Sequence, residues 1–74
     1  MARGTHDDRY RALLRLLREH RQSQGLTQAV LAKRLGRPQQ FVSKYEAGER
    51  RLDVIEFMDV ARALGLDWRQ ALDS

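Results

Sequence analysis

The stretch TQAVLAKRLGRPQQFVSKYEAG, residues 27–48, holds two short helical patterns separated by one glycine. Thr27 is suited to cap the first predicted helix, residues 28–35, because its hydroxyl can accept a hydrogen bond from a free backbone N–H of the first turn. Gly36 can adopt the left-handed conformation that ends a helix without a Cβ penalty. The second predicted helix covers residues 38–47. Two helices joined by a short turn that contains glycine form a helix-turn-helix.

Residues at both ends of the second helix fit its boundaries. Pro38 suits the first turn of a helix, where the missing N–H has no intrahelical partner to lose. Gly48 is positioned to stop the same helix. The motif is therefore bounded on both sides, and residues 48–52 are predicted to form a loop.

A further helix is predicted before this stretch. Apolar residues recur there at i, i+3, i+4 and i+7, which places them on one helix face; they are Tyr10, Leu13, Leu14 and Leu17. The segment THDD, residues 5–8, matches a capping box at the start of this helix, and Gly25 is positioned to close it. Residues 1–6 are predicted to be a flexible tip.

Two more helices are predicted after the stretch. Asp53 and Glu56 have capping-box spacing at the start of the first, which Gly65 ends. A broad apolar face predicts that this helix is the most buried one, and its apolar residues are Val54, Ile55, Phe57, Met58, Val60, Ala61 and Leu64. Asp67 can cap a short last helix. With no strand pattern, the prediction is an all-α fold, a compact five-helix bundle that forms one domain over residues 1–74.

The composition excludes several classes of site. The chain has no cysteine, which excludes disulfides and thiolate zinc sites, and only two histidines, so no metal or other cofactor is expected. It contains no nucleophile–base set and no glycine-rich phosphate loop, so an enzyme is not predicted. No apolar run is long enough to span a membrane, and the N-terminus lacks the apolar core of a signal peptide. The predicted location is therefore the cytoplasm.

Positive charge is concentrated in the first two thirds of the chain. Residues 1–24 hold six arginines against three acidic residues, and residues 25–51 hold six basic residues against two acidic ones. Residues 52–74 carry two arginines against five acidic residues. This asymmetry indicates a polyanionic partner. The arginines of the first helix are also consistent with a solvated face or a membrane surface, but a short helix with a glutamate favours a globular domain without a membrane partner.

The apolar positions of the second helix leave one of its sides facing outward. The candidates for base contact on and beside that face are Gln39, Gln40, Phe41, Ser43 and Lys44, with Phe41 near the boundary. A glutamine amide in the first turn offers a donor and an acceptor that match adenine N6 and N7 in the major groove. Phe41 could touch a thymine methyl group, and Lys44 could reach a guanine edge or a phosphate. The alternative is that these polar residues form an ordinary solvated surface.

The start of the helix at residues 28–35 is a candidate phosphate site. Free backbone N–H groups and the helix dipole both favour an anion there. Basic residues in the neighbouring turns extend this site. The candidates for phosphate contact are Thr27, Gln28, Arg37, Arg50 and Arg51.

Three spaced runs together resemble the Cro/C1-type, or XRE-type, helix-turn-helix domain: LTQAVLAKRLG at 26–36, VSKYEAGERR at 42–51 and VARALGLDW at 60–68. The resemblance covers about residues 10–72. It implies a five-helix domain that binds operator DNA, usually as a dimer, in prokaryotes and phages.

The resemblance also implies roles for individual positions. Gln28 corresponds to a glutamine that contacts DNA in phage repressors, and positions 39, 40 and 44 correspond to base-reading positions. Arg21 and Glu46 occupy the places of an arginine and a glutamate that pair between two helices. Phe41 is bulkier than its counterpart in the lambdoid repressor with a similar glutamine pair, so the same half-site is not expected.

Two functions follow from these patterns. The first is a sequence-specific transcriptional repressor that occupies a palindromic operator in double-stranded DNA as a homodimer. Its dimerisation candidates are Leu66, Trp68 and Leu72, although Trp68 is also suited to close the bottom of the core. The alternative is a protein-interaction module, such as a DNA-binding antitoxin that covers a separate toxin.

Overall fold

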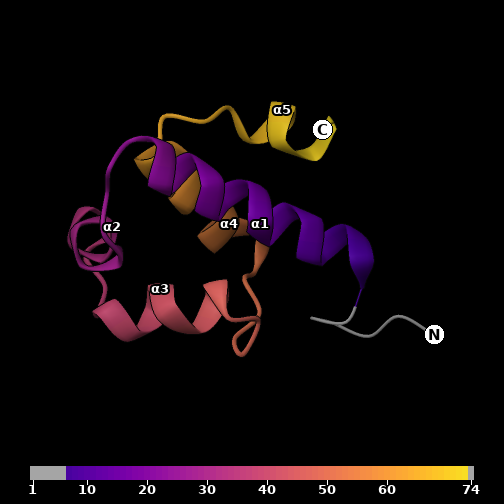
Figure 1. The fold of residues 1–74 in the computed structure, drawn as a ribbon. Coiled ribbons are helices and arrows are strands. Elements are labelled where there is room, and N and C mark those ends of the chain that lie inside the picture. The colour runs from indigo at the N-terminus through magenta and orange to yellow at the C-terminus, as the bar shows by residue number, and fades with distance from the viewer. Residues whose placement is uncertain (1–6, 74) are drawn as a thin grey trace.

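The described part of the chain, residues 7–73 of a computed structural model, contains five helices and no strand (Figure 1). The helices are α1 (Asp8–Ser23), α2 (Gln28–Leu35), α3 (Gln39–Glu46), α4 (Val54–Ala63) and α5 (Trp68–Asp73). This confirms the predicted all-α fold, with α2 and α3 as the two helices of the motif. The predicted tip at residues 1–6 lies outside the described residues.

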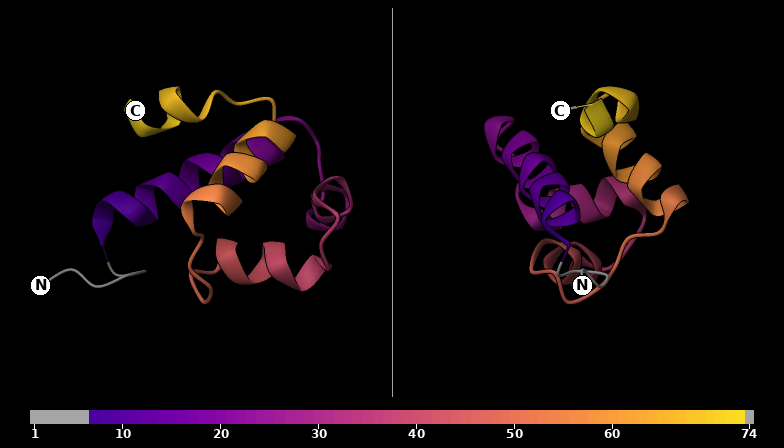
Figure 2. Two further views of the ribbon diagram at one scale, coloured as in Figure 1. Left: turned by 180° about the vertical axis from the view of Figure 1, so that it is seen from behind. Right: turned by 90° about the vertical axis from the view of Figure 1, so that its right-hand side faces the viewer.

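All five helices contribute to a common core, α5 through Ala71. Helix α1 runs across the molecule with α3 on one side and α5 on the other, while α4 lies behind it and α2 closes one end (Figures 1 and 2). The largest fully buried side chains come from α1, α2, α3 and α4; they are Leu17, Leu31, Val42, Tyr45 and Val60. The helix-turn-helix is therefore held from behind by α1 and α4, which leaves one side of α3 in solvent.

The ends of the motif helices have the geometry that their residues predict. The hydroxyl of Thr27 accepts a hydrogen bond from the Val30 N–H at 3.1 Å, which caps α2. Gly36 has a left-handed backbone, with φ of 68°, and its N–H donates to the Lys33 carbonyl at 3.1 Å. At α4, Asp53 and Glu56 form the reciprocal capping box. The chain thus changes direction at positions where the sequence supplies the required cap or turn residue.

Two predicted helix starts differ from the structure. Asp7 is the N-cap of α1 and accepts from the Arg9 N–H at 2.8 Å, whereas residues 5 and 6 of the predicted capping box lie outside the described residues. Pro38 occupies the N-cap position of α3 rather than its first helical residue. Its φ of −62° fits a helix, but its ψ of 151° keeps the backbone extended, so α3 begins at Gln39.

The broad apolar face predicted for α4 is only partly buried. Val54 and Ile55 are 71% and 65% exposed. The core-facing stripe is formed instead by Glu56, Phe57, Val60 and Ala61. A helix turns one stripe toward a core, so the apolar residues at the start of α4 remain on the surface.

Candidate nucleic-acid interface

Helix α3 presents a polar and unengaged first turn. Phe41, Val42 and Tyr45 form its buried side. Gln39, Gln40 and Lys44 are exposed, and their side chains make no hydrogen bond or ion pair with any other described residue. Ser43 is half-buried, and its hydroxyl donates to the Gln40 carbonyl at 3.3 Å. The structure therefore places the two glutamines and Lys44 on the solvent side with their polar groups free for a ligand.

Phe41 departs from its predicted position near the boundary of this face. The residue is 7% exposed, and its ring packs edge-to-face on Tyr45, with ring centroids 5.5 Å apart. The guanidinium groups of Arg37 and Arg50 lie over the same ring at 4.4 and 4.9 Å. Positions 41, 42 and 45 share one stripe of a two-turn helix, so Phe41 follows its neighbours into the core.

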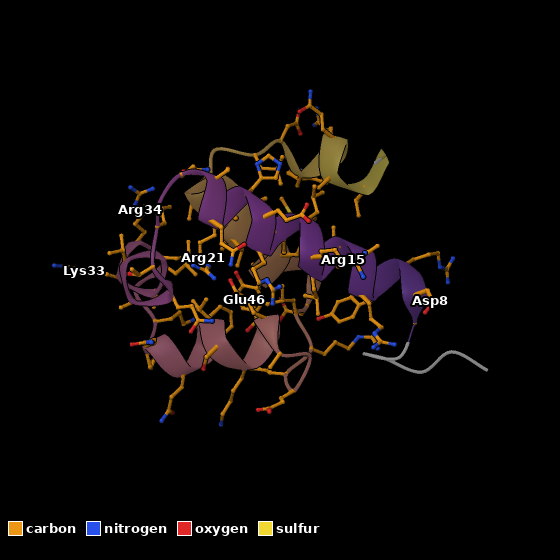
Figure 3. All side chains as sticks on the ribbon, in the orientation of Figure 1. Asp8, Arg15, Arg21, Lys33, Arg34 and Glu46 are labelled. Carbon is orange, nitrogen blue, oxygen red and sulfur yellow. The ribbon has the colours of Figure 1, made fainter. Side chains whose placement is uncertain are left out.

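The structure brings Arg21 of α1 and Glu46 of α3 together (Figure 3). Arg21 Nε donates to Glu46 Oε2 at 2.7 Å and Nη2 donates to Oε1 at 3.0 Å. The side chains are only 10% and 4% exposed, and Arg21 Nη1 also donates to the Leu26 carbonyl at 2.7 Å. The hydrogen bond to Glu46 raises the pKa of Arg21 above its usual value. This pair fixes the C-terminal end of α3 against α1.

Gln28, a predicted phosphate contact, joins the same pair. Its Nε2 donates to Glu46 Oε1 at 2.9 Å. An amide nitrogen carries two hydrogens, so one N–H of Gln28 remains for a phosphate at the start of α2. Glu46 thus orients both Arg21 and Gln28.

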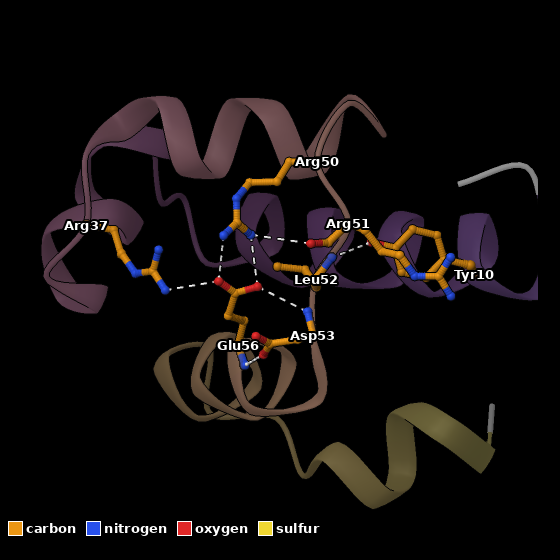
Figure 4. A network of polar contacts seen from close by, with 7 residues as sticks. All are labelled: Tyr10, Arg37, Arg50, Arg51, Leu52, Asp53 and Glu56. Carbon is orange, nitrogen blue, oxygen red and sulfur yellow. Dashed lines mark hydrogen bonds and ion pairs between the residues drawn. The ribbon is translucent and has the colours of Figure 1, made fainter. Parts of the chain in front are cut away.

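Glu56 is the centre of a second polar network (Figure 4). Arg50 donates to both of its carboxylate oxygens, at 2.9 and 2.8 Å, and Arg37 Nη2 donates to Oε2 at 3.1 Å. The Asp53 N–H donates to Oε1 at 3.0 Å. These bonds, the Arg50 bond first, lower the pKa of Glu56 from 4.5 to about 2. The network ties α4 to the turn before α3 and to the loop after it.

This network changes the interpretation of two predicted phosphate contacts. Arg37 and Arg50 have their guanidinium groups on Glu56 and over the Phe41 ring, with side chains about 40% exposed. Arg51 is exposed and lies over the Tyr10 ring at 5.4 Å, with no ion pair among the described residues. Of the three predicted arginines, Arg51 is the one that forms no ion pair among the described residues.

The predicted dimerisation residues line two different hollows. Leu66 and Trp68 are half-buried and line a hollow of about 320 Å³ beside Met58 and Arg62 of α4. Leu72 is 58% exposed and lines a different hollow, against the first half of α1. Val54 and Ile55 are the more exposed apolar residues on the α4 side. Sequence reasoning missed them because the helical period alone gave no reason to leave them outside.

Two further features escaped prediction. Tyr10 was assigned only to the apolar face of α1, yet its hydroxyl accepts from the Leu52 N–H at 2.9 Å and fixes the loop after α3. Glu56 was predicted only as a cap, although two arginines stand within six residues before it. Only Arg50 of these two binds Glu56, and the other partner, Arg37, is 19 residues away in the sequence, so local spacing gave no sufficient signal.

Neither a metal site nor a membrane span is found in the described part of the chain. No group of three or more His, Asp or Glu residues there could hold a metal ion. No helix within residues 7–73 is both long and apolar enough to cross a bilayer.

The fold and the free first turn of α3 define a protein of the DNA-binding helix-turn-helix class. A helix-turn-helix family model matches residues 17–70. A solved XRE-family-like protein from Pseudomonas syringae pv. tomato is 60% identical, with a TM-score of 0.88 over 92% of this chain and 83% of that chain. The restriction-modification controller protein C.AhdI from Aeromonas hydrophila is 29% identical, with a TM-score of 0.76 over 84% of this chain and 94% of that chain. No curated protein sequence matches.

The chain therefore belongs to the XRE (Cro/C1-type) family of helix-turn-helix proteins, a family of DNA-binding transcription regulators.

Proposed function

We propose that this protein is a sequence-specific regulator of transcription that binds a palindromic operator and represses by occupying it. The observation that carries the proposal is the first turn of α3, where Gln39 and Gln40 are exposed with unengaged amides. The similarity to a restriction-modification controller supports the regulator class. The buried side of α3 packs on the core, which suits this task because base readout requires side chains held in a fixed position against the groove.

The proposed reading of bases starts at the N-terminal end of α3. Each glutamine amide can pair with adenine N6 and N7 in the major groove. Lys44 lies one turn further along and reaches a guanine edge or a phosphate. Ser43 is half-buried and bonded to the Gln40 carbonyl, so it contributes to the shape of this surface more than to readout.

The proposed contacts with the DNA phosphate backbone begin at α2. Its free N–H groups, the exposed cap residue Thr27 and the second N–H of Gln28 face one phosphate region. Arg51 supplies an unneutralised charge from the loop after α3. Arg37 and Arg50 act chiefly as the support of Phe41 and Glu56, and only their remaining exposed N–H groups are left for phosphate.

The proposed homodimer uses the α4–α5 side. Val54 and Ile55 precede Met58 by four and three residues, so the three share one face of α4. Met58 lines the hollow with Leu66 and Trp68, which continues the exposed apolar surface toward α5. A symmetric pair across this face would double the number of base contacts and place the two recognition helices about 34 Å apart on DNA.

Selection from random duplexes, with the bound sequences read out, tests the function. We expect an inverted repeat whose preferred bases change in the Gln39→Ala and Gln40→Ala variants. Enrichment of no sequence by the parent protein would contradict the proposal.

The dimer is tested separately by sedimentation of parent and Ile55→Glu protein, alone and with operator duplex. We expect two copies per operator for the parent and one for the variant, whereas Leu72→Glu should leave the stoichiometry unchanged. If Ile55→Glu instead removes binding of a different, co-purifying protein and leaves two copies on DNA, the exposed face serves the antitoxin-type alternative.

A further inference from the structure

Three arginines of α1 form a row that has no ion-pair partner among residues 7–73. Arg11, Arg15 and Arg18 follow one another at i, i+4 and i+7, which places them on one face of the helix. All three are exposed, and none forms a hydrogen bond or ion pair with another described residue. The other two arginines of this helix are both paired, Arg9 with Asp7 and Arg21 with Glu46. The row is therefore not explained by pairing within the fold.

The row faces an open hollow beside the C-terminal end of α3. The hollow has a volume of about 430 Å³, and its walls are Arg11, Leu14, Arg15, Arg18, Glu46, Ala47 and Gly48. Figure 3 shows Arg15 on α1 and Glu46 between α1 and α3. Glu46 is the one acidic residue in these walls, and Arg21 and Gln28 already occupy its oxygens. The hollow thus carries three positive charges that nothing in its walls neutralises.

The length of the row fits a DNA strand. At about 1.5 Å of rise per residue, Arg11 and Arg18 stand about 10 Å apart along α1. One strand of duplex DNA carries a phosphate about every 3.4 Å of helix axis, but its phosphates also wind around that axis and so stand farther apart than this rise. A straight row of about 10 Å therefore matches two or three successive phosphates. Guanidinium groups bind phosphate oxygens with two parallel N–H bonds. Like charges on neighbouring turns also repel one another, and a bound polyanion relieves this repulsion.

The position of the row connects it with the proposed phosphate site at α2. Glu46 lines the hollow and also accepts from Gln28 at the start of α2. The two sites therefore adjoin at one residue. The hollow also borders Gly48, which follows the C-terminal end of α3, whereas Gln39 and Gln40 lie at the N-terminal end of that helix. A DNA strand bound at the hollow would therefore lie away from the bases that the first turn would read.

Resting on the proposed function, we propose that Arg11, Arg15 and Arg18 form a second phosphate-binding site. It takes successive phosphates of one strand at the edge of the half-site, adds affinity and carries no base preference. The site is distinct from the helix-turn-helix, because all three of its charged side chains come from α1.

The salt dependence of binding gives the first test. Each neutralised phosphate contributes about 0.9 to the slope of log K against log salt, so the R11Q/R15Q/R18Q variant should lose up to about 2.7 units of slope on a selected operator duplex. Glutamine has nearly the helix propensity of arginine, so α1 is retained, and a thermal melt checks this. Arg15→Gln should lose about 0.9, which is about threefold in affinity over a fourfold change of salt. Lys33→Gln is the matched control, since it removes from α2 (Figure 3) one exposed charge that has no ion pair among the described residues, and its slope should stay at the parent value.

Duplexes that each carry one neutral methylphosphonate linkage locate the contact. We expect two or three adjacent linkages that weaken binding of the parent but not of the R11Q/R15Q/R18Q variant. The inference is overturned if parent and variant respond alike to every linkage, or if the variant keeps the full slope, while the parent still selects an operator. If the parent selects no duplex sequence, the proposed function itself fails, and this inference fails with it. Loss of an acidic protein partner with unchanged DNA binding would assign the row to protein recognition and overturn the phosphate assignment.

Discussion

Replacing Glu46 with alanine should unfold this domain more readily than any change to a surface ion pair. Glu46 accepts three hydrogen bonds, two from Arg21 and one from Gln28, at 2.7 to 3.0 Å. Its side chain is 4% exposed and that of Arg21 is 10% exposed. Removing one partner of such a pair leaves a buried charge uncompensated, which costs about 3–5 kcal/mol. A domain has only about 5–15 kcal/mol of stability in total.

The loss is measurable by thermal and urea unfolding. For a domain of this size, 1 kcal/mol lowers the melting temperature by about 4–8 °C, so Glu46→Ala should melt at least about 12 °C below the parent. Arg9→Ala is the control, because Arg9 pairs with Asp7 while being 92% exposed, and such pairs contribute about 0–1 kcal/mol. An Arg21→Met/Glu46→Leu variant should recover most of the loss, since it strands no charge. The reasoning is refuted if Glu46→Ala and Arg9→Ala melt at the same temperature.

Four further outcomes are expected. Alanine at Gln39 or Gln40 should cost about 1–3 kcal/mol on the selected operator in a binding titration and leave affinity for random DNA unchanged. Because the pKa of Glu56 is lowered from 4.5 to about 2, the stability it contributes is present above pH 4.5 and lost as the pH falls toward 2; urea unfolding across this range should show a shallower loss in Glu56→Gln. Arg51→Ala should reduce the salt slope of binding by about 0.9 without changing the preferred sequence. The Tyr45 hydroxyl is buried with no hydrogen-bond partner in the described structure, so Tyr45→Phe should leave the melting temperature unchanged or raise it, and a drop of several degrees would show that the hydroxyl is satisfied.

Local signals were sufficient for most of the fold. Thr27, Gly36 and Asp53 each act through backbone atoms within a few residues of themselves, and each lies where its residue type predicts. The apolar residues of α3 also define its outer face, which leaves Gln39 and Gln40 in solvent. Such features depend on short-range geometry, which the order of residue types largely determines.

Contacts between distant elements were harder to predict. Val54 and Ile55 have the same apolar character as Phe57, and only the position of α4 against the other helices decides which of them is buried. Phe41 stood near the boundary by helical period alone. Arg37 and Arg50 lie over its ring and cover it from solvent, and Arg50 comes from the loop after α3.

The arginines around Glu56 show why positive charge alone does not locate a phosphate contact. Arg50 and Arg51 are adjacent in the sequence and equally basic, yet Arg50 donates to both oxygens of Glu56 while Arg51 lies over Tyr10 with its charge unpaired. A guanidinium that is already bound to a carboxylate has fewer N–H groups and less uncompensated charge left for a phosphate, so it adds less to DNA affinity than a free one. The free basic residues in the described structure include Lys44 and Arg51 beside α3 and the row of Arg11, Arg15 and Arg18 on α1. Counting unpaired charges rather than all charges therefore moves the expected backbone contacts away from Arg37 and Arg50 and toward α1.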